Sequence, residues 1–229
     1  MSFDVWTADS TDWLAHWSAW PEREPHAHPA YASLYEGTGT RALCAAWRSD
    51  AGCVLYAFLL RAYKGIDVLV RALGEIPGAR LVVAGDPLDP IEPLQELARA
   101  LGVHERIEWR LGFLPDSEVD ELMRETTVVV LPYRRTDASG VLATAIGHGR
   151  PVVVTDVGAL GETVRDFDLG EVVPPGDAQA LAAACVRLLE PGRLAAAFEG
   201  TRSARQALTW DAAAIEHEHV YEDVLSGRS

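Results

Sequence analysis

The distribution of hydrophobic positions changes near residue 60, and beyond it two kinds of apolar segment alternate along the chain. Short apolar runs without polar alternation are typical of strands buried on both faces of a parallel sheet. Such runs occupy residues 81–85, 127–131, 151–155 and 172–176, and residues 106–109 are predicted to form a further short strand. Segments whose apolar residues recur every three or four positions are predicted helices, over residues 91–101, 117–123, 139–148, 178–189, 193–207 and 210–225. The alternation predicts an α/β domain with a doubly wound parallel sheet.

The first 60 residues follow a different pattern, and five of the seven tryptophans precede residue 50. Residues 9–20 carry apolar side chains on one face of a predicted helix. Residues 41–47 and 52–60 are predicted to form two strands around a turn. We therefore expect a small N-terminal segment, a helix plus a hairpin, over residues 1–60 and a Rossmann-like domain over residues 61–229.

Composition and charge exclude several classes of function. Hydrophobic residues make up 48% and charged residues 24% of the chain, which are proportions typical of globular proteins. The net charge of -14 opposes binding to nucleic acid phosphates and to anionic lipid. No apolar run is long enough to cross a bilayer, and residues 1–20 are acidic and unlike a secretory signal. We expect a cytoplasmic protein with no transmembrane segment and no nucleic acid partner.

The sequence contains no pattern typical of a metal site or of a dinucleotide cofactor. Its three cysteines, Cys44, Cys53 and Cys185, form no Cys-x-x-Cys motif and cannot all pair. This spacing argues against a disulfide framework and against structural zinc. A P-loop and a Gly-x-Gly-x-x-Gly motif are also absent. We therefore expect neither a metal nor a cofactor.

One strand-to-helix loop has the composition of an anion site. The predicted strand at residues 127–131 leads through two arginines, Arg134 and Arg135, to Ser139 and Gly140 at the start of a helix. Backbone N–H groups at a helix N-terminus attract anions, and a glycine lets a ligand approach them. The alternative interpretation is an ordinary capped helix.

A second loop contains Lys64, the only lysine in the chain, directly before Gly65 at the start of another predicted helix. A flexible ammonium group at this position could reach a diphosphate. The alternative interpretation is a solvated lysine without a ligand.

Seven short motifs, which occur in a fixed order, carry a resemblance to a known family. They are Tyr63-Lys-Gly-Ile-Asp67, Leu81-Val-Val-Ala-Gly85, Gly112-Phe-Leu-Pro115, Val129-Val-Leu-Pro132, Ser139-Gly-Val141, Gly149-Arg-Pro-Val-Val-Val-Thr155 and Val173-Pro-Pro-Gly-Asp177. Over about residues 60–226, the chain resembles the C-terminal half of a family 4 glycosyltransferase of the GT-B architecture. That half binds the nucleotide-sugar donor, so the resemblance implies a UDP or GDP sugar as ligand. It also implies anomer-retaining transfer without a structural metal.

The resemblance assigns donor-binding roles residue by residue. The implied residues are Lys64, Arg61, Phe113, Leu114, Thr136, Ser139, Gly140, Val141 and Thr144. Lys64 matches the lysine that contacts the diphosphate, and residues 139–141 match the loop whose amides hold the phosphates. The family's usual arginine, five residues before the lysine, is replaced by Leu59, which makes Arg61 a candidate substitute.

The remaining assignments concern the nucleoside. Phe113 and Leu114 match the segment beside the nucleobase. Thr136 and Thr144 match the two positions of the family's paired glutamates, the second of which usually holds the ribose. A threonine hydroxyl can still bind a ribose hydroxyl, although more weakly than a carboxylate does.

The sequence lacks a counterpart of the acceptor-binding domain of such enzymes. The resemblance therefore implies an acceptor half supplied by another chain, or a homo-oligomer. Residues 13–17, Pro29-Ala-Tyr31 and residues 53–61 resemble the opening of Fem-like or GNAT-type acyltransferases, which implies a fusion joined inside residues 58–64. Two alternatives stay open, a non-catalytic remnant or interaction module and a fragment of a Fem-like acyltransferase.

Overall fold

The computed structural model of the chain describes residues 53–226, with side chains described from residue 61 onward except at 210, 213 and 216. The helix expected over residues 9–20 and the strand expected over residues 41–47 lie outside the described residues.

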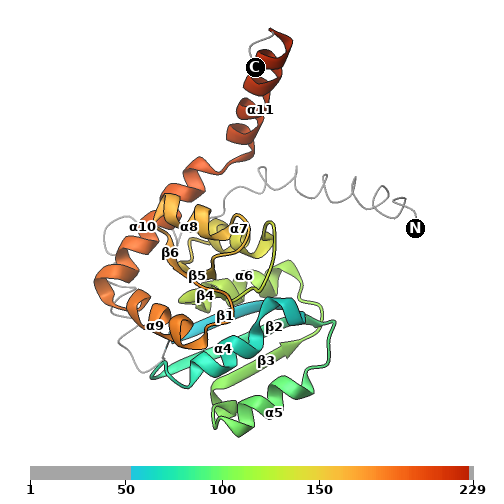
Figure 1. Cartoon of the computed structure of the whole chain (residues 1–229), viewed down its shortest axis with the longest axis vertical. Helices are drawn as coiled ribbons and strands as arrows, with labels where there is room; N and C mark the ends of the chain where they lie inside the picture. Colours follow the sequence, from blue (N-terminus) through green and yellow to red (C-terminus); the bar gives the residue numbers. More distant parts are fainter. Residues whose placement is uncertain (1–52, 227–229) are drawn as a thin grey trace, which may run out of the picture. The chain divides into compact units, whose positions relative to one another are not determined.

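A six-stranded sheet forms the centre of the described domain (Figure 1). Its strands are β1 (Cys53–Leu60), β2 (Ala79–Pro87), β3 (Ile107–Leu111), β4 (Val128–Leu131), β5 (Val152–Thr155) and β6 (Gly170–Val173). They lie in the order β3-β2-β1-β4-β5-β6, and every neighbouring pair is parallel. The chain builds outward from β1 to β3, returns to β4 beside β1, and builds outward again to β6. This topology confirms the predicted doubly wound α/β fold.

The position of β1 corrects one expectation from the sequence. The hairpin predicted in the N-terminal segment uses residues 52–60 as one of its strands, but β1 is a central strand of the parallel sheet. In β1, Leu55 lies opposite Leu81 of β2 on one edge and Val128 of β4 on the other. Because a strand has only two edges, β1 has none left for an antiparallel partner. Residues 53–60 therefore belong to the sheet of the larger domain.

Helices cover both faces of the sheet. On one face lie α4 (Ile66–Leu73), α5 (Glu92–Ala100) and α9 (Ala178–Leu188), with α4 in contact with both of the others (Figure 1). On the other face lie α6 (Asp116–Glu125), α7 (Gly140–Gly147) and α8 (Leu160–Phe167), which share one hydrophobic cluster. The chain ends with α10 (Pro191–Ala207) and α11 (Trp210–Leu225), and two short 3-10 helices, η2 (Ala62–Lys64) and η3 (His104–Arg106), lie in loops.

The strand residues divide between the two faces by simple alternation. Val129, Leu131, Val152 and Val154 belong to the cluster that packs against α6, α7 and α8. Their neighbours in sequence, such as Val130, are also completely buried and point the other way. Each such buried side chain contributes about 1.5–3 kcal/mol to folding. Burial on both faces explains why the strands appear in the sequence as continuous apolar runs.

The order in which the chain adds strands to the sheet reverses between β1 and β4. The loop after β1 leads through η2 into α4 on one face, and the loop after β4 leads into α7 on the other. The carboxyl ends of these two adjacent strands therefore open a crevice, because their connections diverge. Open α/β sheets bind ligands at such a switch point.

The last helix contrasts with the packed domain. The apolar side chains Ile215, Val220, Tyr221, Val224 and Leu225 of α11 are all more than half exposed. Among the described helices, none is both long and apolar enough to cross a membrane.

Candidate functional site

Lys64 occupies the loop after β1, and its side chain is only 7% exposed. Its Nζ lies 3.9 Å from the centre of the Tyr133 ring and 5.3 Å from that of Tyr63. The two rings meet edge to face, with centroids 6.4 Å apart. No carboxylate of the described residues pairs with this ammonium group. Lys64 is therefore a buried cation held by aromatic faces rather than the solvated lysine of the alternative interpretation.

Burial changes the protonation of this site. Desolvation of the ammonium group lowers the pKa of Lys64 to about 8. Burial also raises the pKa of Tyr133 to about 12, so that the ring below Lys64 stays neutral. An anion that reached Lys64 would favour its charged form. The site therefore has the electrostatic character of a receptor for an anion.

The Lys64 loop lies directly against the end of β4. Gly65 has a φ of +69°, and a Cβ at this position would lie 2.0 Å from the carbonyl oxygen of Pro132. Only glycine tolerates both the left-handed backbone and this contact. The glycine thus lets the loops after the two strands touch.

Arg134 bonds the same two loops together. Its guanidinium donates to both oxygens of Asp67, at 2.9 and 2.7 Å, and to the carbonyl of Ala62 at 2.8 Å. Its backbone N–H donates to the carbonyl of Tyr63 at 2.7 Å. Burial alone would raise the pKa of Asp67, but the hydrogen bonds and charge of Arg134 hold it below its usual value. Arg134 is therefore engaged within the protein, and it does not supply the unpaired charge suggested by the sequence.

The start of α7 presents unpaired backbone donors. Ser139 is the N-cap, and its Oγ accepts the N–H of Leu142 at 3.3 Å. The N–H groups of Gly140 and Val141 have no acceptor among the described residues. A Cβ on Gly140 would meet no atom within 4 Å, so this end of the helix is open. Two free amides at an open N-terminus form a suitable cradle for a phosphate group.

The two threonines at the glutamate positions use their hydroxyl protons locally. The Thr136 hydroxyl donates to the carbonyl of Ala138 at 2.6 Å. The Thr144 hydroxyl donates to the carbonyl of Gly140 at 2.9 Å. Each oxygen keeps a lone pair that can accept a hydrogen bond from a ribose hydroxyl. Their role at the ribose stays a prediction.

An open hollow of about 540 Å³ lies between the loop after β4 and the loop after β5. Its lining residues are Tyr63, Arg134, Arg135, Thr136, Asp137, Val157 and Gly158. The two loops are hydrogen-bonded, because the Ala159 N–H donates to the Asp137 carbonyl at 3.0 Å. Asp137 has no motif around it, so the sequence did not indicate it as a site residue. The carboxylate of Asp137 and the guanidinium of Arg135 place a negative and a positive charge at the hollow.

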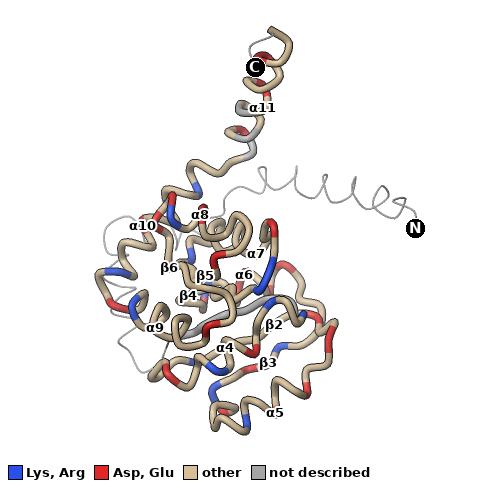
Figure 2. Tube along the Cα trace, in the orientation of Figure 1, with Lys and Arg blue, Asp and Glu red and all other residues tan. Residues whose placement is uncertain are grey.

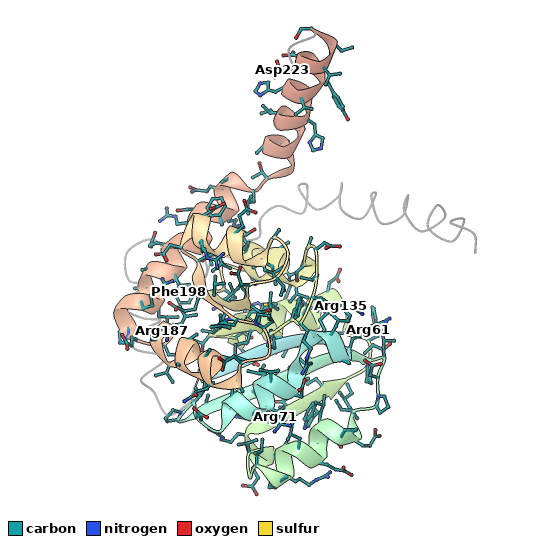
Figure 3. All side chains as sticks on the ribbon, viewed as in Figure 1. Arg61, Arg71, Arg135, Arg187, Phe198 and Asp223 are labelled. Atoms are coloured by element: carbon teal, nitrogen blue, oxygen red, sulfur yellow. The ribbon has the colours of Figure 1, made fainter. Side chains whose placement is uncertain are left out.

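Arg135 remains a free cation of this loop. Arg134 and Arg135 are consecutive in the loop before α7. Figure 2 colours the basic stretches of the chain blue. Among the described residues, no carboxylate pairs with Arg135, and its side chain is exposed. Arg61 is likewise exposed and unpaired within the described part of the chain, on the loop that holds Lys64. Figure 3 labels Arg61 and Arg135 on their respective loops.

The segment predicted to lie beside the nucleobase is farther from these loops. Phe113 is 86% exposed and follows β3, the edge strand, which β2 separates from β1. Leu114 is partly buried against the cluster under α6. No described contact joins either residue to Lys64, so the structure alone does not bring the base segment to the phosphate cradle.

Polar groups elsewhere in the described domain are organised differently. No set of three His, Cys, Asp or Glu side chains within residues 61–226 is placed to hold a metal ion. His148 links two helices, because its Nε2 lies 2.9 Å from Asp120 and its Nδ1 lies 2.8 Å from the Thr144 carbonyl. This histidine fastens the end of α7 to α6.

Comparison with known proteins agrees with the geometry. The profile of the family described as glycosyl transferases group 1 matches residues 53–191. The chain belongs to this family. The match begins at the first residue of β1, in agreement with the place of residues 53–60 in the sheet. The fusion joined inside residues 58–64 stays a prediction.

A D-inositol 3-phosphate glycosyltransferase from Acidothermus cellulolyticus is 34% identical to this chain over 191 residues. The alignment covers 77% of this chain and 42% of the relative. The chain spans about half the length of the curated relatives it matches.

Solved glycosyltransferase structures share the fold. Sucrose-phosphate synthase from Thermosynechococcus elongatus superimposes with a TM-score of 0.66 at 27% identity, over 82% of this chain and 49% of that one. Anabaena HepE, solved in complex with UDP-glucose, gives a TM-score of 0.66 at 22% identity, over 85% of this chain and 55% of that one. The described domain therefore corresponds to part of a GT-B glycosyltransferase, as the resemblance implies.

Proposed function

We propose that this glycosyltransferase chain binds a nucleotide-diphosphate sugar of the UDP or GDP type at the switch point between β1 and β4. The observation that carries the proposal is the pairing of a buried, unneutralised Lys64 with the free amides of Gly140 and Val141 on the adjacent loop. One side supplies a cation and the other supplies donors for phosphate oxygens. Family membership and the UDP-glucose bound by HepE support the same ligand class.

The site suits the departure of a diphosphate. In glycosyl transfer, the bond between the anomeric carbon and the β-phosphate oxygen breaks, and the electron pair leaves with the diphosphate. Lys64 and the amides of α7 would stabilise that negative charge, which is an electrostatic form of catalysis. Retention requires the acceptor hydroxyl to form its new bond on the face that the diphosphate leaves, and its proton passes to the departing diphosphate.

The second substrate requires surfaces beyond the described domain. We propose that an acceptor-binding half, provided by another chain or by a second copy, completes the reaction centre. The exposed aromatic ring of Phe113 and the partly buried Leu114 would then border the nucleobase. Thr136 and Thr144 would accept hydrogen bonds from sugar or ribose hydroxyls.

Calorimetric titration with UDP, GDP and ADP tests the donor site. We expect one diphosphate to bind, and Lys64→Ala and Ser139→Ala each to weaken binding by about tenfold, equivalent to about 1.4 kcal/mol. Thr209→Ala is the matched control for Ser139→Ala, since Thr209 caps α11 through the Ala212 N–H at 3.1 Å. It should lower stability similarly and leave binding unchanged. A folded protein that binds no nucleotide at millimolar concentration would indicate a non-catalytic remnant.

A further inference from the structure

Arg134 and Asp67 join the two loops of the proposed donor site, although neither is a donor ligand. We propose that this ion pair is a clamp that positions Lys64 over Tyr133 and keeps its ammonium group available to the diphosphate. The inference rests on the proposed function, because it concerns how the same site is held ready. Both residues are positioning residues, since they act through Lys64.

The contacts of Arg134 surround Lys64 in the sequence. Its guanidinium reaches the Ala62 carbonyl and both Asp67 oxygens, at 2.7–2.9 Å. Its backbone N–H reaches the Tyr63 carbonyl at 2.7 Å. The residues bonded therefore lie on either side of Lys64, and the loop cannot shift without breaking several hydrogen bonds. The side chain and the backbone of one residue, Arg134, thus hold the loop after β1, and only the side-chain bonds are lost when Arg134 is replaced.

The clamp also sets the aromatic support beneath the ammonium group. Tyr133 precedes Arg134, and its ring is 1% exposed while the arginine is exposed. These two consecutive side chains therefore lie on opposite sides of the loop, with Tyr133 pointing inward and Arg134 outward. The Tyr133 ring consequently lies 3.9 Å below Lys64 Nζ. Holding Arg134 in place on the outer side therefore keeps the Tyr133 ring beneath the Lys64 ammonium group.

The clamp has a second, electrostatic consequence. Asp67 follows Lys64 by three residues, and both of its carboxylate oxygens are bonded to Arg134. That carboxylate is therefore not available to neutralise the lysine, and the cation waits for an external anion. Removal of Arg134 would release a negative charge beside the site, which opposes diphosphate binding. Removal of Asp67 would loosen the clamp without releasing that charge.

Loss of the clamp should leave the fold intact. The Arg134 and Asp67 side chains are 43% and 33% exposed. Ion pairs with this degree of exposure contribute little to folding stability. Variants of this pair should therefore remain folded, and their effect on Lys64 can be measured directly.

The chain offers a specific probe, because Lys64 is its only lysine. Labelling with 13C-lysine gives a single side-chain signal in the full protein. Stacking over Tyr133 should shift the ε-methylene signal upfield in the wild-type protein. We expect Arg134→Gln and Asp67→Asn to remove this shift and to weaken UDP binding by about tenfold. We expect Asp67→Glu to retain most of the shift.

Arg165→Gln is the matched control. Arg165 forms a similar two-bonded pair with Asp156, at 3.1 and 2.6 Å, but it lies on α8 and does not contact the Lys64 loop. This variant should leave both the lysine signal and the UDP affinity unchanged. A lysine effect in this variant equal to that of Arg134→Gln would overturn the proposal.

The two readouts separate this inference from the proposed function. An unchanged lysine signal in folded Arg134→Gln overturns the clamp, whatever happens to UDP. An unchanged UDP affinity in that variant also overturns it, provided that the wild-type protein binds UDP. If the lysine signal moves and the wild-type protein binds no nucleotide, the clamp is supported and the donor site is not.

Discussion

Lys64 shows how the placement of a single residue can cost folding stability. Its ammonium group is buried, has two aromatic neighbours, and lacks a carboxylate partner among the described residues. Aromatic faces offset only part of the lost hydration, and the lowered pKa reports the remaining cost. A bound anion would offset this cost, because it favours the charged form of the lysine. The protonation of Lys64 should therefore affect both folding stability and nucleotide binding.

Replacing the buried cation should stabilise the protein. The pKa of Lys64 falls from 10.5 to about 8 on folding, so the cost of its charge is fully present below pH 8 and is relieved between pH 8 and 10.5. At pH 7 we expect Lys64→Met to be more stable than wild type by about 3 kcal/mol. This advantage should shrink as the pH rises to 10. Urea unfolding at several pH values measures it, and an advantage that does not change with pH would contradict the assignment.

Nucleotide binding should depend on the same proton. The diphosphate interacts with the charged form of Lys64, whose pKa in the free protein is about 8. Affinity for UDP should therefore be steady between about pH 7 and 7.5 and fall as the pH rises above about 8. Calorimetry across this range, with Lys64→Met as the control, gives the profile. A similar decline in the control would assign the effect to another group.

At the scale of elements, the start of α7 and the loop before α4 form the two sides of the proposed donor site. The cap of α7 comes from Ser139, which leaves the amides of Gly140 and Val141 free. The loop before α4 contacts Pro132 through Gly65. Gly140 therefore leaves the N-terminus of α7 open, whereas Gly65 lets two loops of the protein touch.

Gly140→Ala should separate binding from folding. A methyl group here meets no atom of the protein within 4 Å, and alanine favours a helix more than glycine does. Folding stability should therefore be unchanged or up to about 1 kcal/mol higher, while UDP affinity falls about tenfold because the methyl group covers the amides. Gly147→Ala, at the other end of α7 and equally unobstructed, is the control. Equal UDP affinities in the two variants would rule out phosphate binding at this helix end.

Gly65→Ala should instead damage the fold. Its added Cβ would overlap the Pro132 carbonyl, and its φ of +69° is strained for any residue with a side chain. Gly78→Ala has almost the same φ, +70°, with no atom within 4 Å, so it measures the backbone strain alone. We expect about 1 kcal/mol of destabilisation at Gly78 and about 3 kcal/mol or more at Gly65. Thermal unfolding compares them, and equal losses would mean that the two loops can move apart freely.

At the scale of the whole molecule, the described domain corresponds to part of a GT-B glycosyltransferase. Its chain spans about half the length of the curated relatives it matches. The proposed donor crevice opens at the carboxyl ends of β1 and β4, so an acceptor must reach it from beyond that edge of the sheet. The exposed apolar side chains of α11 form the largest group of such residues on one described helix.

Patterns of apolar residues predict strands and helices, because these depend on residues that are close together in the sequence. The strand expected over residues 127–131 is β4 (Val128–Leu131), and the helix expected over residues 139–148 is α7 (Gly140–Gly147). The helix α8 (Leu160–Phe167) was not predicted, although Leu160, Val164 and Phe167 have helical spacing.

The alternation of strands and helices, the family, and the two loops that hold Lys64 and Gly140 could be inferred from the amino-acid sequence. These depend on residues close together in the chain, such as apolar runs and a glycine at the start of a helix. Three features became visible in the folded domain alone: β1 lies between β2 and β4, Lys64 lies over Tyr133, and Arg134 is bonded to Asp67. Strand order and side-chain pairing join residues tens of positions apart, and local periodicity carries no information about such contacts.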